Sequence, residues 1–465
     1  MKKLILLVTL CCLVCFPSCN KKAQFIEYKN SAVTAYPVAK GAEQSSHYKC
    51  TVSGQQVQLY SMGEDAYGIL KFNSTAKVTI DSDHVVSNAT VYSQSATKKV
   101  SLENSVIEFT VSRPGSYVVN LDDKNKIYLI FDEENYFGAI DTNTEVFEQG
   151  VNKTKAKIEK GVLNLKSDTT YFLQYGSVLS GKIVGDNVSN VTIIGGGVVT
   201  DGIALTDCDN IDVNLVTVTG SVDVSHSSNI KFENTKIISE TNALTFISCA
   251  DSEFTGGFIK SHGDSVSVKN APHLSPDLAT DDVDIEFDKS ENITISNCVV
   301  DSVDGNSLQI GRETVGDRIS DITFKNITIV ENINGVALAV NNFNNSKISR
   351  VVFDNITVEN AQPKSDSNFL IDIKNMYSLE YSDLYASTPI GDIDGITFRN
   401  INMTSGKKDI GISFRGYKEA REQYQSLVHK VSNIYFKDCE ILGVKLSRSY
   451  YYMYLGSHVE GLIFE

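Results

Sequence analysis

The chain has 465 residues, of which 42% are hydrophobic and only 7 are proline. This composition supplies enough apolar material for a sizeable core and excludes wholesale disorder. The formal net charge of −15, with no visible basic face, argues against a nucleic-acid partner. It argues less strongly against a polyanionic ligand, because a local basic pocket can exist in an acidic protein.

The N-terminus has the pattern of an export signal. Lys2 and Lys3 precede an apolar run over 4–16, which is too short for an ordinary membrane-spanning helix. Pro17, Ser18 and Cys19 then resemble the lipobox of bacterial lipoproteins, in which a cysteine after a small residue is lipidated. We expect a signal peptide over 1–18, a lipid on Cys19 and a polar tether to residue 40. The anchored protein would lie in the bacterial cell envelope, periplasmic or on the outer surface. The alternative is an ordinary secretion signal with an incidental cysteine.

Short alternating strands separated by turn signals occupy residues 41–132. Runs such as 77–80, 107–111 and 128–131 alternate apolar and polar residues, and Pro114 with Gly115 marks a turn. This spacing predicts a small antiparallel β-sandwich. Residues 133–154 are predicted to form a linker.

From residue 155 to 465 the chain repeats one phrase: a polar pair, an aliphatic residue, an alternating strand, then Asn or Asp. Copies begin at Ser189, Ser228, Glu291, Ser320, Ser349, Asp394 and Ser432. Repeating strands without a helical pattern between them predict a β-solenoid whose aliphatic residues stack between coils. We expect Asn and Asp at the corners, where they tolerate left-handed geometry. The one helix-like run, 417–431, would be a loop insertion.

Five cysteines follow Cys19 in the chain. An odd number without a C-x-x-C pair argues against a disulfide framework or a zinc knuckle. Four of them follow Asp, Ser or Asn in similar settings and are predicted to be small core residues of successive coils: Cys208, Cys249, Cys298 and Cys439.

Several stretches resemble the polygalacturonase-like glycoside hydrolases of family 28. They are 161–165, 176–181 and 191–202 at the entry, and 431–434 with 459–464 at the end. Family 49 dextranases are similar and place a β-sandwich before the β-helix. The resemblance covers about 41–465. It implies an all-β fold, namely a right-handed parallel β-helix preceded by a small antiparallel β-sandwich, and a polysaccharide or oligosaccharide partner.

The resemblance also implies three catalytic aspartates, of which this chain keeps one. The Asp of the family's Asn-Thr-Asp-Gly motif falls on Asn242, and the adjacent pair falls on Gly263 and Asp264. Inverting hydrolysis needs one carboxylic acid for the leaving oxygen and a carboxylate to activate water. Asp264 holds a water-activating position, whereas the general-acid position is Gly263. The family's cationic Arg-Ile-Lys clamp falls on 337–340, which is uncharged, so hydrolysis of unmodified polygalacturonate is not expected.

Other residues could complete the site. Asp304 lies near the family's Gly-His-Gly position, and Asp281 with Asp282 forms an adjacent acidic pair. We expect these three residues to assist Asp264 in catalysis. The residues expected to contact the sugar are Asn242, His262, Lys269, Gln309, Arg312 and Glu313.

Residues 281–288 form a second acidic constellation. Alternation would place Asp282, Asp284, Glu286 and Asp288 on one face of a strand. Three interpretations stay open: a solvated face balanced by Lys269, Arg312 and Arg318; a catalytic group; or a Ca²⁺ site at Asp282, Asp284 and Glu286. No other cofactor is expected. The chain has no Trp, so a sugar-stacking platform must use Tyr or Phe; the tyrosine-rich run 450–454 is one candidate, or an edge of the last coil.

The sequence therefore favours a polysaccharide-directed, glycoside hydrolase-like lipoprotein that cleaves a neutral or modified glycan with inversion. The preserved architecture supports this interpretation. The alternative is a catalytically inactive β-helix that binds glycan or serves as a structural surface protein, which the loss of two carboxylates favours. A polysaccharide lyase is a third reading, suggested only by Lys269 beside the acidic strand.

Overall fold

The computed structural model describes residues 32–35, 43–93, 100–133, 143–272, 288–364, 368–379 and 388–465. Cys19 and the predicted signal peptide lie outside these residues, as do Asp281, Asp282, Asp284 and Glu286. Within the described ranges, no helix has both the length and the apolar character needed to cross a membrane.

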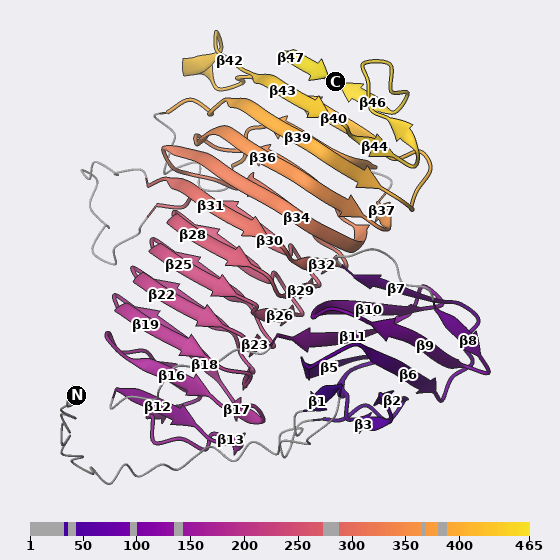
Figure 1. Cartoon of the computed structure of the whole chain (residues 1–465). Coiled ribbons are helices and arrows are strands. Elements are labelled where there is room, and N and C mark those ends of the chain that lie inside the picture. The colour runs from indigo at the N-terminus through magenta and orange to yellow at the C-terminus, as the bar shows by residue number, and fades with distance from the viewer. Residues whose placement is uncertain are drawn as a thin grey trace, which may run out of the picture.

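Two sheets form the N-terminal body (Figure 1). One has the order β1-β5-β11-β10-β7, with β4 on β5, and the other has the order β3-β2-β6-β9-β8. All pairings are antiparallel except that of β5 with β11. The strands are β1 (Val33–Ala35), β2 (Tyr48–Val52), β3 (Gln55–Val57), β4 (Tyr60–Met62), β5 (Asp65–Phe72), β6 (Ala76–Ser82), β7 (Ala89–Ser93), β8 (Ser101–Glu103), β9 (Val106–Val111), β10 (Gly115–Leu121) and β11 (Asn125–Asp132).

The rest of the described chain winds into a parallel β-helix with three faces, which we name A, B and C. Faces A and B form one continuous 22-stranded sheet, and face C is a 12-stranded sheet. Face A contains β12 (Thr144–Phe147), β16 (Thr170–Leu173), β19 (Ser189–Ile194), β22 (Asp209–Asn214), β25 (Ser228–Glu233), β28 (Ala250–Thr255), β31 (Ser290–Ser296), the first parts of β34 (Arg318–Asn334), β36 (Lys347–Val358) and β39 (Ile393–Met403), then β43 (Val431–Lys437) and β47 (Val459–Phe464).

The other two faces are built from shorter strands. Face B contains β13 (Gly150–Val151), β17 (Ser177–Leu179), β20 (Val198–Val199), β23 (Thr217–Val218), β26 (Lys236–Ser239), β29 (Phe258–Ser261), β32 (Val299–Ser302), the last parts of β34, β36 and β39, β37 (Ala361–Pro363) and β44 (Glu440–Ile441), with β45 (Val444–Lys445) antiparallel to β44. Face C contains β14 (Ile158–Glu159), β15 (Val162–Asn164), β18 (Lys182–Asp186), β21 (Ile203–Thr206), β24 (Val222–Ser225), β27 (Leu244–Ile247), β30 (Val266–Lys269), β33 (Leu308–Arg312), β35 (Leu338–Asn342), β38 (Phe369–Asn375), β40 (Gly411–Arg415) and β46 (Met453–Leu455).

In-register pairing places like residues above one another in successive coils. Phe324, Phe353, Phe398 and Phe436 stack in a column with ring centroids 4.9 Å apart, which matches the spacing of neighbouring strands. The four cysteines predicted for the core are buried and free. Asn and Asp occupy left-handed corner positions, for example Asn190, Asn210 and Asn229. The expected all-β class, a β-helix together with antiparallel sheets, is confirmed.

Two local expectations differ from the structure. The strand β12 pairs in parallel with β16, so the β-helix begins inside the stretch 133–154 that we expected to be a linker. The strands there, β12 and β13, are too short to show a clear alternation in the sequence. The helix-like run 417–431 contains the hairpin of β41 (Tyr417–Lys418) and β42 (Val428–His429), with a 3-10 turn at Glu422–Tyr424. It is an insertion, as expected, but its hydrogen bonds are those of a hairpin.

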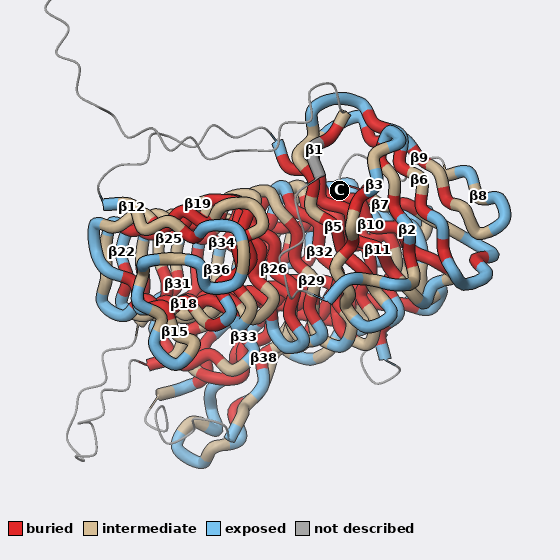
Figure 2. The backbone as a smooth tube through the Cα atoms, turned by 90° about the horizontal axis from the view of Figure 1, so that it is seen from below, coloured by how far each residue is buried: buried red, intermediate tan, exposed pale blue. Residues whose placement is uncertain are grey.

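The sandwich packs against face B, as Figures 1 and 2 show. An apolar cluster joins Tyr67, Val118 and Tyr128 of the sandwich to Phe258 and Val299 of the helix. Buried ion pairs cross the same junction: Lys126 with Asp301 at 2.8 Å, and Lys236 with Asp132 at 2.6 Å. The sandwich therefore lies beside the turns that join face B to face C.

Candidate functional site

The turns from face B to face C stack closely enough to require glycine. We name this stack the B–C corner; it includes residues 240–243, 262–265, 303–307 and 335–337. A Cβ on Gly305 would lie 2.1 Å from the carbonyl carbon of Gly263, and one on Gly335 would lie 1.8 Å from the oxygen of Gly305. Successive backbones are thus in contact at this corner, which fixes the positions of the neighbouring side chains.

Asp264 is the middle rung of a hydrogen-bonded ladder along the corner. The Oδ1 of Asn242 accepts from the N–H of Asp264 at 2.9 Å, and the Oδ1 of Asp264 accepts from the N–H of Asn306 at 2.7 Å. The Oδ1 of Asn306 then accepts from the N–H of Val336 at 2.8 Å. In each rung a side-chain oxygen accepts a hydrogen bond from a backbone N–H of the next coil. The ladder therefore requires an acceptor oxygen at each position but no charge.

The carboxyl group of Asp264 is partly buried, and burial raises its pKa above the ordinary 3.8. The N–H of Asn306, the hydroxyl of Ser267 and the charges of Arg312 and Lys269 oppose this rise. The Oγ of Ser267 lies 3.4 Å from Oδ2. A carboxylate with a raised pKa is a stronger base, which suits the activation of water.

The structure explains why position 263 holds glycine. A Cβ there would lie 2.4 Å from the Oδ1 of Asn242 and 3.1 Å from its backbone nitrogen. The ladder therefore occupies the space that a side chain at 263 would need. A general acid at this position, where the resemblance places one, would displace the Asn242 oxygen from its hydrogen bond to Asp264 and crowd the backbone of Asn242.

Asp304 and His262 lie together on the exposed rim of the corner. The Nε2 of His262 is 2.9 Å from Oδ2 of Asp304, whose Oδ1 accepts from Asn334 at 2.6 Å. The hydrogen bond from Asn334 lowers the pKa of Asp304, and the nearby Lys364 and His262 lower it further. Asp304 is thus suited to stay ionised and to accept hydrogen bonds, and is poorly suited to donate a proton.

The remaining predicted residues fall into two groups. Gln309 is buried on the outer side of β33, where its amide accepts from Asn306 and donates to the carbonyl of Ile310. It supports the ladder. Arg312 is exposed, stacks 5.5 Å over Phe343 and lies 3.4 Å from Glu313. The structure thus brings Asn242, Asp264 and Gln309 together, and separately Arg312 with Glu313.

Sequence reasoning missed two cations on face C. Lys374 lies 5.7 Å over the same Phe343 ring and 2.7 Å from the buried Asp372. Arg415 is its register partner on the next strand. Both point outward at equivalent positions of successive coils, but 40 residues of sequence separate them, so only the register reveals the pair.

The tyrosine-rich run is divided between the core and the surface. Tyr450 packs against the core and donates a hydrogen bond to the carbonyl of Ile410 at 2.8 Å. Tyr451, Tyr452 and Tyr454 are exposed.

Potential metal ligands converge at one place among the described residues. His47, Asp83 and His84 hold their ligand atoms within 4.8 Å of one another on the sandwich. These residues are partly or fully exposed and lie on a different body from the ladder. The Ca²⁺ site expected at Asp282, Asp284 and Glu286 lies outside the described residues.

Comparisons with known proteins show the fold. No protein-family model matches the chain, and no curated protein matches it. Among solved structures, Dex49A from Penicillium minioluteum matches with a TM-score of 0.53 and 9% identity, over 90% of this chain and 93% of that one.

Two further structures resemble the chain. A family 28 exopolygalacturonase from Yersinia enterocolitica matches with a TM-score of 0.43 and 10% identity, over 84% of this chain and 96% of that one. An exopolygalacturonase from Thermotoga maritima matches with a TM-score of 0.44 and 14% identity, over 69% and 84%. The match to Dex49A spans both the sandwich and the helix, and it confirms at the level of fold the expected resemblance to β-helix glycoside hydrolases.

Proposed function

We propose that this protein is directed at a polysaccharide and hydrolyses a neutral or modified glycan with inversion, using Asp264 to activate water. One observation carries the proposal. The rungs on either side of Asp264 are Asn242 and Asn306, so the fold needs only an amide at this position. The chain nevertheless has a partly buried carboxylate there whose pKa is raised. A perturbed carboxylate that the fold does not require is a candidate for chemistry.

The surroundings of Asp264 fit this role in part. Lys269 and Arg312 act on its charge without touching it, and Asn242, His262 and Asp304 offer hydrogen bonds along the corner. We propose Asp281 or Asp282, which lie outside the described residues, as the proton donor. Position 263 is a glycine, and the lowered pKa of Asp304 makes it less suited to this role.

Stereochemistry tests the proposal. Purified protein is incubated with dextran, laminarin, xylan, arabinan and unmodified polygalacturonate, and fresh products are followed by proton NMR. We expect a neutral glycan to release reducing ends with the anomeric configuration inverted, and polygalacturonate to stay intact. Retained configuration, or turnover of polygalacturonate above about 1 per second, would contradict the assignment.

A second function is favoured by the glycine at 263 and the asparagine at 242. With two of three expected carboxylates absent, the same corner could bind glycan without cleaving it. The NMR panel separates the two functions when it is paired with affinity electrophoresis. Retardation of the protein by a glycan that stays uncleaved would establish binding alone.

We further propose that the protein is anchored in the cell envelope by a lipid on Cys19. The motif before Cys19 supports this. The Cys19→Ala variant is expected to lose acylation and leave the membrane fraction. A variant that fractionates wholly with membranes and is still fully acylated would show that the motif was misread.

A further inference from the structure

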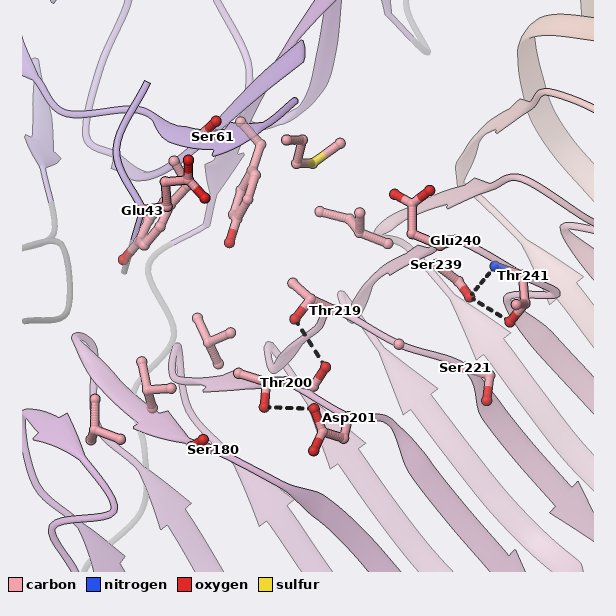
Figure 3. Close-up of a pocket in the computed structure, with 18 residues that line it drawn as sticks. Glu43, Ser61, Ser180, Thr200, Asp201, Thr219, Ser221, Ser239, Glu240 and Thr241 are labelled. Atoms are coloured by element: carbon pink, nitrogen blue, oxygen red, sulfur yellow. Dashed lines mark hydrogen bonds between the residues drawn. The ribbon is translucent and has the colours of Figure 1, made fainter. Parts of the chain in front are cut away.

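A cleft of about 750 Å³ lies between the sandwich and the helix, next to the B–C corner. This volume is within the range of small-molecule sites. Figure 3 shows Glu43 and Ser61 of the sandwich on one side, and Thr200, Asp201, Thr219 and Glu240 of the helix on the other. None of these residues belongs to the ladder around Asp264.

The floor of the cleft and one wall are apolar. Val178, Val198 and Ile238 point outward from face B. From the sandwich, the rings of Tyr60 and Tyr67 stack with centroids 4.8 Å apart and planes at 12°. Tyr67 is buried, so the half-buried ring of Tyr60 is the one that can face a ligand. Flat aromatic surfaces suit the C–H faces of pyranose rings, and Tyr is the available residue in a chain without Trp.

The rim is polar, and its acceptors are charged. Thr200 donates to Asp201 at 3.0 Å and accepts from the N–H of Gly181 at 3.0 Å, which holds this part of the rim in place. The exposed side chain of Glu240 makes no hydrogen bond or ion pair with any described residue. Carboxylates accept hydrogen bonds from sugar hydroxyls, and those of Glu43, Asp201 and Glu240 together repel an anionic chain.

We infer that this cleft is a second glycan-binding site, which takes a neutral oligosaccharide and holds it beside the Asp264 ladder. It spans the turns of four coils, those containing Ser180, Thr200, Thr219 and Thr241, or three strand spacings of roughly 4.8 Å each. That length accommodates a few sugar units. Thr241 at its end is followed directly by Asn242 of the ladder, so one chain can occupy both. The inference rests on the proposed function and names the substrate class.

The test measures binding separately from cleavage. Affinity electrophoresis and calorimetry are carried out with dextran, laminarin, xylan, arabinan and their oligosaccharides, using the Asp264→Asn background so that the ligand is not consumed. The cleft variants are Tyr60→Leu, which keeps apolar bulk, and Glu240→Gln. Glu440→Gln, the same change at an exposed residue of the last coils, is the control, and melting curves verify folding.

Each cleft variant is expected to weaken binding of long neutral oligosaccharides by about tenfold, the loss of one charged hydrogen bond or one stacking contact. The affinity of the cleft variants for disaccharides should stay unchanged, and the control variant should bind every glycan as the Asp264→Asn background does. Equal affinity of both cleft variants and the control for every glycan overturns the inference, as does the absence of any binding glycan, which overturns the proposed function too. Weakened binding in the cleft variants, together with turnover that survives Asp264→Asn, would support the glycan site in the cleft and contradict the catalytic role of Asp264.

Discussion

Two neighbouring coils of the β-helix each carry an aspartate, and the surroundings of the two carboxylates differ. At the junction with the sandwich, Asp301 of β32 is completely buried, and Lys126 Nζ lies 2.8 and 2.9 Å from its two oxygens. The hydroxyl of Tyr128 adds a third hydrogen bond at 2.6 Å. At the B–C corner, Asp264 is only partly buried and has a backbone N–H and a distant hydroxyl as its partners.

The difference separates a structural carboxylate from an available one. Burial alone would lower the pKa of Lys126, but Asp301 and Glu331 outweigh it and the net shift is upward. Buried ion pairs such as these stabilise the fold only while every partner is present, because removing one leaves the other charge buried without compensation. The Oδ2 of Asp264 has only the hydroxyl of Ser267 at 3.4 Å as a partner, and the pKa of Asp264 is raised. Its protonation state can therefore change without breaking an ion pair.

The largest expected effect is on the junction. Lys126→Met leaves Asp301 and Glu331 buried without a cation, which should lower the free energy of unfolding by about 3–5 kcal/mol. Denaturant unfolding monitored by circular dichroism measures this. In the control variant Lys231→Met, which removes a half-exposed lysine 3.5 Å from Glu253, the loss should stay below about 1 kcal/mol. Equal losses in the two variants would mean that the buried ion pair at the junction contributes no more to stability than the ion pair of Lys231.

A smaller effect is expected at the crowded corner. Gly263→Asp forces the new Cβ against Asn242 and should cost about 1–3 kcal/mol. Asn242→Asp, which adds a carboxylate of the same shape at an exposed rung, should change stability by less than about 0.5 kcal/mol. Thermal melting of both variants tests the claim, and a Gly263→Asp protein as stable as the wild type would show that the corner is not closely packed.

The smallest effect is a pH dependence. The pKa of Asp264 is raised in the folded protein, so the unfolded chain loses this proton first as the pH rises. The contribution of Asp264 to stability is therefore fully present below the ordinary value of 3.8 and is lost as the pH rises through the folded pKa. Relative to Asp264→Asn, the wild type should lose stability over that window and then level off. A constant difference between the two proteins would contradict the raised pKa.

The sequence was sufficient to predict the β-helix, because alternating aliphatic residues recur along the coils and Asn or Asp stands at many of the corners. The site was predicted only in part. Asn242, Asp264 and Asn306 are 22 and 42 residues apart, because one coil carries an insertion, so their ladder appears only in three dimensions. Buried lysines such as Lys126 and Lys236 run against the usual exposure of lysine. The contribution of Tyr60 and Glu43 to the cleft depends on how the sandwich docks, which local patterns do not encode.

The comparison of Asp264 with its two asparagine neighbours gives the most direct test of the proposed chemistry. Wild type and Asp264→Asn are assayed side by side on the neutral glycan that the NMR panel identifies, for product release, affinity and melting temperature. We predict that the variant folds and binds as the wild type does, because an amide oxygen can fill the rung, while turnover falls by about 10² or more, the scale for losing a general base. Turnover that is unchanged in a correctly folded Asp264→Asn protein would contradict the central claim.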